Sequence, residues 1–144
     1  MFQDSLGRLV NVAARTMRAL LDARLAEEGM SFATWVSLMM LASQGPLGQG
    51  DLAEHMQVEG PTLVRRLDQL EAAGLVERVA DAADRRRVSV TLTPRGKTAF
   101  ARVRSSVQTT EDSMLDGIDQ ADLETTRRVL RELTERARRL RTGS

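Results

Sequence analysis

The sequence contains no cysteine and a single histidine, His55. The lack of cysteine excludes disulfide scaffolds, thiolate catalysis, cysteine-based redox sensing and nearly every structural zinc site. A catalytic zinc ion usually takes about two or three imidazole ligands, so we interpret His55 as a partly exposed helix residue. The sequence also lacks a glycine-rich phosphate loop and any recognisable motif of paired acids. These absences predict a protein that is not an enzyme and that uses no metal or cofactor.

Aromatic side chains are scarce as well. The chain has three phenylalanines, one tryptophan and no tyrosine, which together make up 3% of its residues. Proteins that bind single-stranded nucleic acid or RNA stack the bases on exposed aromatic rings. If the partner of this protein is a nucleic acid, the sequence therefore predicts a duplex.

Long hydrophobic runs are absent too. No stretch of about 18 apolar residues could cross a bilayer, and the N-terminus lacks the short apolar core and cleavage site of a secretory signal. A length of 144 residues favours one domain, 1–144, over two. We therefore expect a cytoplasmic protein that makes no contact with a membrane.

The charged residues are abundant but unevenly distributed. Residues 60–105 carry ten basic and five acidic side chains, a net charge of +5, and residues 127–144 also carry +5. Residues 106–126 between them carry six acidic and no basic side chains. Separate basic blocks are typical of a protein that places one surface against phosphates and keeps the rest away from them. Ordinary solvated helix faces would explain either basic block equally well.

Apolar residues at helical spacing predict long helices near both ends of the chain, over 5–27, from 94 to about 115, and from Asp119 to 141. Ser31 is a good N-cap for a further helix over 32–43, and residues 47–49 fit a short connecting or edge strand. The terminal helices have no obvious partner within one small domain. Their remaining apolar faces suggest pairing with a second copy of the chain, as a homodimer.

Two short helices, 51–57 and 61–73, are expected in the middle of the chain, separated by a tight turn. Pro61 suits the first turn of the second helix because its missing N–H costs nothing there. The spacing predicts that one face of this helix enters the core with Leu63, Val64, Leu67 and Leu70. The opposite face then carries Thr62, Arg65, Arg66 and Gln69. Two such helices, the second with a polar outer face, are typical of a helix-turn-helix.

The periodicity then changes from helical to alternating. Apolar residues occupy every other position in 75–79 and in 88–92, which predicts a β-hairpin. Its loop carries Asp84 followed by three arginines, Arg85, Arg86 and Arg87. A basic hairpin tip directly after a helix-turn-helix indicates a wing that reaches DNA. The sequence therefore predicts a mainly α fold with a small β-hairpin, a winged helix-turn-helix.

The run from residue 60 to residue 96, GPTLVRRLDQLEAAGLVERVADAADRRRVSVTLTPRG, resembles the MarR family of bacterial transcription regulators. The upstream run SFATWVSLMMLASQGPLGQGDLAEHM matches the second and third helices of that family, and RALLDARL with PTLVRRLDQLE is most similar to its SlyA branch. The resemblance implies a dimer with a winged helix-turn-helix over about 31–93 and dimerisation helices over about 5–27 and 94–141. Gly50 stands where many relatives have serine or threonine to cap the third helix.

The resemblance implies sequence-specific binding to a pseudo-palindromic duplex operator, by a repressor or an anti-silencing activator. Thr62, Arg65 and Arg66 would lie at the exposed start of the recognition helix, and we expect Arg65 to reach a base edge. Arg85 would enter the minor groove, while Asp84 would orient a guanidinium or brace the wing. A winged-helix module that binds another protein, with arginines that serve solubility, is the alternative.

Members of the family often bind small phenolic or aromatic carboxylates between the dimer helices and the winged domain. The corresponding residues here are Arg15, Arg18, Trp35 and Met39. Trp35 could stack on an aromatic ring, and Arg15 or Arg18 could pair with its carboxylate. A tryptophan and a methionine at helical spacing are equally consistent with plain core packing, so the ligand site is one of two open interpretations.

Overall fold

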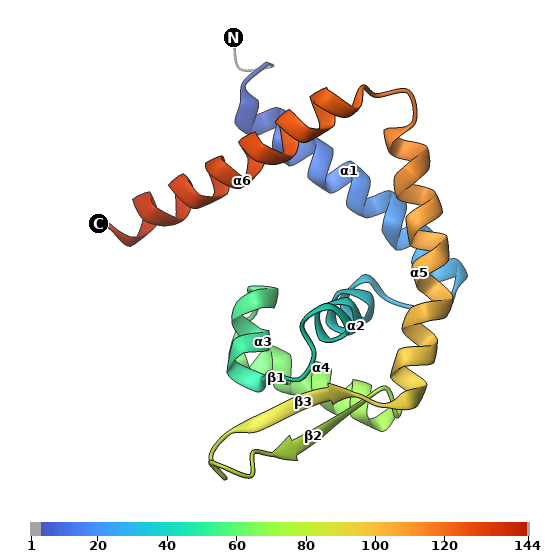
Figure 1. The fold of residues 1–144 in the computed structure, drawn as a ribbon, viewed down its shortest axis with the longest axis vertical. Coiled ribbons are helices and arrows are strands. Elements are labelled where there is room, and N and C mark those ends of the chain that lie inside the picture. The colour runs from blue at the N-terminus through green and yellow to red at the C-terminus, as the bar shows by residue number, and fades with distance from the viewer. Residues whose placement is uncertain (1–3, 144) are drawn as a thin grey trace. The chain divides into compact units, whose positions relative to one another are not determined.

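The computed structural model describes residues 4–143 of the chain. The chain divides into two units, residues 1–110 and 111–144. The first unit holds, in order, α1 (Leu6–Glu27), α2 (Phe32–Gln44), β1 (Leu47–Gly48), α3 (Gln49–Met56), α4 (Gly60–Ala72), β2 (Val76–Ala80) and β3 (Val88–Leu92) (Figure 1). Helix α5 (Pro94–Leu115) runs from the first unit into the second, which also holds α6 (Gln120–Thr142). The mainly helical fold class predicted from the sequence is confirmed.

The helix ends follow the capping residues of the sequence. The Ser31 hydroxyl accepts a hydrogen bond from the Thr34 N–H at 3.1 Å, and the Asp119 carboxylate accepts one from the Ala121 N–H at 2.8 Å. Gly29, which follows the C-cap residue Glu28 of α1, has a φ of +71°, which an L side chain rarely adopts. The predicted starts of α2 and α6 are therefore confirmed.

The sheet has three antiparallel strands in the order β1-β3-β2. Val76 on β2 faces Leu92 on β3, and Leu47 on the short edge strand β1 faces Val90. Strand β2 begins one residue later than the alternation predicted. The reason is that the Leu75 N–H donates to the Leu70 carbonyl at 2.9 Å, so Leu75 closes the end of α4 instead of starting the strand.

Helix α3 begins earlier than the sequence indicated. Its N-cap is Gly48, the last residue of β1, so that Gly50 lies inside the first helical turn. The expectation that Gly50 caps this helix is wrong. The chain turns directly from strand to helix at Gly48, where an added Cβ would lie 3.1 Å from Oδ2 of Asp51. The cap therefore lies two residues before the position that the resemblance suggested.

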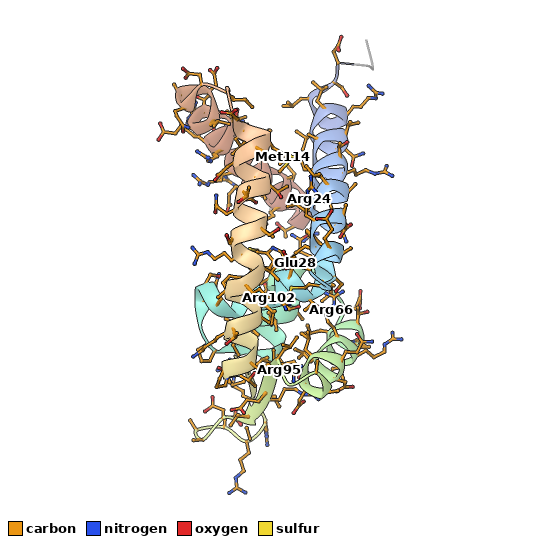
Figure 2. The ribbon with its side chains drawn as sticks, turned by 90° about the vertical axis from the view of Figure 1, so that its right-hand side faces the viewer. Arg24, Glu28, Arg66, Arg95, Arg102 and Met114 are labelled. Atoms are coloured by element: carbon orange, nitrogen blue, oxygen red, sulfur yellow. The ribbon has the colours of Figure 1, made fainter. Side chains whose placement is uncertain are left out.

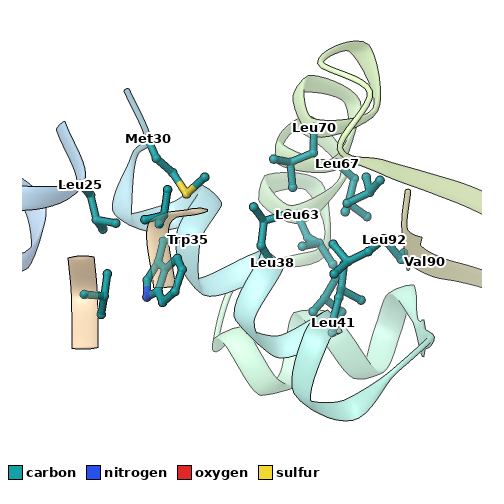
Figure 3. Close-up of a cluster of buried hydrophobic side chains, with 14 residues drawn as sticks. Leu25, Met30, Trp35, Leu38, Leu41, Leu63, Leu67, Leu70, Val90 and Leu92 are labelled. Atoms are coloured by element: carbon teal, nitrogen blue, oxygen red, sulfur yellow. The ribbon is translucent and has the colours of Figure 1, made fainter. Parts of the chain in front are cut away.

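The core of the first unit lies between α2, α4 and the sheet (Figure 3). Leu38, Leu63, Leu67 and Val90 are fully buried there. Val64 does not join them, because it is 36% exposed. Residues 63, 67 and 70 form a stripe at spacings of four and three, and residue 64 lies about 100° further round the helix. The prediction that Val64 enters the core is therefore wrong.

The other end of this core contains the indole of Trp35, which is 6% exposed. Its ring stacks on that of Phe100 in α5, with centroids 5.0 Å apart and an interplanar angle of 16°. Met39, four residues further along α2, is exposed, and so is Ala42. Two apolar residues of α2, Met39 and Ala42, therefore lie outside the core.

Apolar side chains also remain on the surface of the single chain. The large apolar residues that are 38% or more exposed on α1 and α6 are Leu6, Leu9, Val10, Val12, Met17, Leu130, Leu133 and Leu140. They include most of the apolar stripe that the sequence predicted for the two terminal helices. Among the described residues, none of the helices combines the length and the apolar character needed to span a bilayer.

Candidate nucleic-acid interface

Helices α3 and α4 are joined by three residues, Gln57, Val58 and Glu59. Gln57 has a φ of +54°, which ends α3 abruptly in the left-handed region. Val58 is half-buried and packs against the core, so the turn is anchored as well as short. The tight turn between two short helices matches the predicted helix-turn-helix.

The outer face of α4 is accessible along its length. Pro61, Thr62, Arg65 and Gln69 are exposed, opposite the buried stripe of the helix. Arg66 differs from them because it is half-buried on the flank of the helix, where Figure 2 labels it. Of the two arginines on this helix, Arg65 is therefore the more exposed. Arg66 is less exposed than the sequence pattern implied.

The hairpin loop over 81–87 is held in shape by its own backbone. The Asp81 N–H donates to the Arg87 carbonyl at 2.9 Å, and the Arg87 N–H donates to the Asp84 carbonyl at 2.9 Å. The carboxylate Oδ1 of Asp84 accepts a hydrogen bond from the backbone N–H of Arg86 at 3.0 Å. Asp84 therefore braces the loop from within, which is one of the two roles considered for it.

Arg85, Arg86 and Arg87 are all exposed on this braced loop. Figures 1 and 2 show the hairpin and α4 at the same end of the first unit, away from the N-terminal part of α1. Within this unit, the basic loop and α4 thus lie at the same end.

One ion-pair network that sequence reasoning did not single out connects β2 to α4. Nη2 of Arg78 lies 2.6 Å from Oδ1 of Asp68, and its Nε lies 2.7 Å from Oε2 of Glu71. The hydrogen bonds to Asp68 and then to Glu71 raise the pKa of Arg78 further above its already high value. The network connects β2 to α4 through side chains, in addition to their packing in the core.

The joint between β3 and α5 contains a helix cap that the sequence indicates, Thr93 before Pro94, and a close backbone approach that the sequence does not reveal. The Thr93 hydroxyl donates to the Gly74 carbonyl at 2.5 Å and accepts from the Gly96 N–H at 3.0 Å. A Cβ on Gly96 would lie 2.0 Å from the Leu75 carbonyl oxygen. In the sequence, the order T-P-R-G marks the helix start but gives no sign of this contact. The contact between the Leu75 carbonyl and Gly96 depends on the tertiary fold.

The four residues expected to line a ligand cleft have different environments. Arg15 is exposed, and the guanidinium of Arg18 lies 4.5 Å above the ring of Phe32. Met39 is 37% exposed, whereas Trp35 is buried in its stack on Phe100. Two of the four, Arg18 and Trp35, therefore already contact aromatic rings of this chain. Within residues 4–143 no group of three or more histidine, aspartate or glutamate side chains could hold a metal ion.

Comparison with known proteins gives consistent results. The model of the MarR family matches residues 31–88. The crystal structure of transcriptional regulator PA3341 is 36% identical, with a TM-score of 0.85, and the match covers 94% of this chain and 99% of that one. BpsR of Bordetella bronchiseptica, whose DNA binding is regulated by 6-hydroxynicotinic acid, is 25% identical, with a TM-score of 0.82 and coverage of 93% and 96%. A mutant MarR from E. coli, in complex with operator DNA, shares the fold with 24% identity, a TM-score of 0.80 and coverage of 89% and 92%.

Proposed function

The chain belongs to the MarR family of transcription regulators, and on that premise we propose that it binds a specific duplex operator as a homodimer. Helix α4 enters the major groove and the loop between β2 and β3 reaches the neighbouring minor groove. Arg65 reads a base edge and Arg85 the minor groove. The remaining contacts to bases and phosphates come from Pro61, Thr62, Arg66, Gln69, Arg86 and Arg87.

The observation that carries this proposal is the pairing of an exposed polar helix face with a braced basic loop in one unit of the chain. Arg65 and Arg85 are both exposed, and the Arg78 network connects the elements that present them. Specific readout needs side chains that are held in a fixed geometry, because each freely moving arginine loses conformational entropy on binding. An arginine that donates two hydrogen bonds to guanine then contributes about 1–3 kcal/mol of discrimination.

The exposed apolar stripes of α1 and α6 support the dimer. Monomeric proteins rarely leave contiguous apolar faces in water, and two copies related by a twofold axis would cover each other's faces. Such a pair presents two copies of α4 about 34–36 Å apart, which is one turn of B-form DNA. The operator is then an inverted repeat.

A small aromatic carboxylate is the effector class that we propose for the cleft near Arg15, Arg18, Trp35 and Met39. Regulation of BpsR by 6-hydroxynicotinic acid, itself an aromatic carboxylate, supports this class. Arg15 and Met39 are exposed, whereas the Phe100 stack covers one face of Trp35, so the ligand relies mainly on Arg15, Arg18 and Met39. It alters DNA binding only if its affinity differs between the DNA-bound and released conformations.

Selection from a random duplex library, followed by fluorescence anisotropy titrations, tests the proposal. We expect the selected inverted repeat to bind at least about 1,000-fold more tightly than a scrambled duplex, with affinity that falls steeply as salt rises. The matched control is Arg104→Ala, which removes an exposed arginine of α5 from outside both DNA-reading elements. Equal affinity for all duplexes, or none, would contradict the proposal and favour a protein-interaction module. Sedimentation equilibrium checks the dimer separately.

A further inference from the structure

One large apolar side chain of α4, that of Val64, lies outside the core. It is 36% exposed, whereas Leu63, Leu67 and Leu70 on the same helix are 3% exposed or less and belong to the buried cluster (Figure 3). The structure describes every residue of α4, and Val64 is its one large apolar side chain among those left exposed. Within residues 4–143 it is also absent from the half-buried side chains that pack against the core. Core packing therefore does not explain a valine at this position.

Helix stability does not explain this valine either. Valine is branched at Cβ, which restricts its side chain in a helix and makes it a poorer helix former than alanine. Single apolar residues are common on protein surfaces, so exposure alone does not identify a contact. The argument for a contact comes from the position of Val64 on α4.

Val64 lies in the first turns of α4, which begins at Gly60. Pro61 precedes Val64 by three positions and Arg65 by four, so it is the neighbour of both on the helix surface. In a helix-turn-helix, the N-terminal residues of the recognition helix contact base edges. Val64 therefore lies beside the side chains that are proposed to reach the bases.

The other flank of Val64 is acidic. Asp68 follows it by four positions, and the Asp68 carboxylate lies 2.6 Å from the guanidinium of Arg78. Glu71 contacts the same guanidinium, so two carboxylates share one cation and the group keeps a net negative charge. A negative charge repels DNA phosphates, which makes this flank of α4 unsuited to the DNA backbone. A base edge is the surface of the duplex that remains for Val64.

The major groove presents one apolar substituent, the C5-methyl group of thymine, among hydrogen-bond donors and acceptors. The side chain of valine has no polar atom, so it can distinguish bases only through this methyl group. Removing one methyl-sized apolar group from water is worth about fourfold in affinity. An inverted repeat contains the contact twice, so the full effect is about 15-fold.

We infer that Val64 is a specificity-determining residue that reads the C5-methyl group of one thymine in each half of the operator. The inference rests on the proposed function, in which α4 enters the major groove. Arg65 supplies a hydrogen-bonded contact, and Val64 supplies an apolar contact at a neighbouring base. A 5-methylcytosine carries its methyl group at the same ring position, so the same contact accepts a methylated cytosine and disfavours an unmethylated one. Operator affinity therefore responds to a single methyl group on a pyrimidine.

Substitution of deoxyuridine for thymidine is the first test, because the two bases differ only by this methyl group. Each thymine of the selected inverted repeat is replaced in turn, in both half-sites together, and the affinity of the full chain is measured by fluorescence anisotropy. We expect one position at which the wild type loses affinity about 15-fold. Val64→Ala should bind the thymine and uracil operators equally at that position.

Two matched variants separate Val64 from its surroundings. Thr62→Ser removes one methyl group from another exposed residue of α4, and Val79→Ala shortens an exposed valine on β2. Both should retain the difference between the thymine and uracil operators. Urea denaturation shows whether each variant is folded. Val64→Ala should be at least as stable as the wild type, because alanine is the better helix former at an exposed position.

Cytosine methylation is the second test. A cytosine is placed at the position that is sensitive to uracil, and the operator is prepared with and without a C5-methyl group on that base. The wild type should bind the methylated form about 15-fold more tightly, and Val64→Ala should bind the two forms equally. Equal binding of both forms by the wild type would overturn the response to methylation.

A uracil effect that persists in Val64→Ala would overturn the inference, and its loss in Thr62→Ser would assign the methyl contact to Thr62. The absence of any uracil-sensitive position in a specifically bound operator would overturn it as well. In these cases the proposed function stands, since a specific operator is still bound. If no duplex is bound specifically, the proposed function itself fails and the inference fails with it. The two failures are therefore distinguishable.

Discussion

The guanidinium of Arg78, on β2, lies 2.6 Å from the carboxylate of Asp68, on α4. Glu71, one turn further along the same helix, contacts Nη2 and Nε of this guanidinium, each at 2.7 Å. Two acids that point the same way from one helix thus hold one cation from the neighbouring strand. The contact connects α4 to β2 through side chains.

Replacing Arg78 by methionine should lower the free energy of unfolding by about 1 kcal/mol. This estimate is modest because both acids are largely solvated, and exposed ion pairs contribute about 0.2–1 kcal/mol each. Urea denaturation measures it. The control is Arg24→Met, which removes an exposed pair with Glu27 within one helix and should cost less than about 0.5 kcal/mol. Equal losses in the two variants would show that Arg78 has no special role.

The pH dependence of this contribution follows from its sign. Hydrogen bonds to Asp68 and then to Glu71 raise the pKa of Arg78 in the folded protein, so its stabilising effect is complete below the pKa of the unfolded chain. The effect is lost only when the pH rises through the folded-state pKa. Because both values lie far above neutrality, the arginine should cause no loss of stability between about pH 6 and pH 9. A difference between wild type and Arg78→Met that shrinks within that range would contradict this.

Gly96→Ala should be strongly destabilising. Its new Cβ would lie 2.0 Å from the Leu75 carbonyl oxygen, and neither of the two backbones can retreat easily. We expect a loss of about 3 kcal/mol or more, measured by urea denaturation or seen as failure to fold.

Gly50→Ala is the matched control for that substitution. Gly50 lies inside α3, where a Cβ meets nothing within 4 Å, so alanine should stabilise the protein by about 0.5–1 kcal/mol. A destabilised Gly50→Ala would indicate that this glycine is needed for the helix start after all.

Arg65→Ala should relax sequence preference at a single operator position. Its guanidinium is the accessible one on α4, and loss of a bidentate contact to guanine removes about 1–3 kcal/mol of discrimination. Anisotropy titrations against operators with each base at every position measure the effect. A uniform loss of affinity on every duplex would instead assign Arg65 to the phosphate backbone.

Arg85→Ala should weaken binding mainly to operators with A·T-rich flanks, whose narrow minor groove has the most negative potential. Operators that differ only in their flanks reveal this preference. The same loss on G·C-rich flanks would show that Arg85 contributes only general attraction to DNA.

Asp84→Ala tests how the loop presents Arg85. It removes the carboxylate that accepts the Arg86 N–H, and it should reduce operator affinity about threefold to tenfold, the effect of one lost hydrogen bond. Asp84→Asn keeps an acceptor oxygen and should recover most of that affinity. If the two variants behave alike, the charge of Asp84 and not its hydrogen bond is what matters.

Much of the helix-turn-helix and its wing could be predicted from the sequence, since their signals are local. A change from helical to alternating periodicity separated α4 from β2, and Ser31 and Asp119 marked helix starts through hydrogen bonds to residues only two or three positions away. The predictions were wrong where the local pattern allowed two placements of a residue. Val64 follows Leu63 in the sequence but lies on the exposed side of the helix, and the cap of α3 proved to be Gly48 instead of Gly50.

The order of residues by itself determined most of the helices, the wing, the caps of α2 and α6, and the accessible positions of Arg65 and Arg85, because each depends on neighbours within a few positions along the chain. Only the tertiary structure decided which distant residues meet: Arg78 with Asp68, Trp35 with Phe100, and Gly96 with the Leu75 carbonyl. Periodicity reports which face of an element turns inward. It carries no information on which partner that face will meet, since the partner is selected by the packing of the whole core.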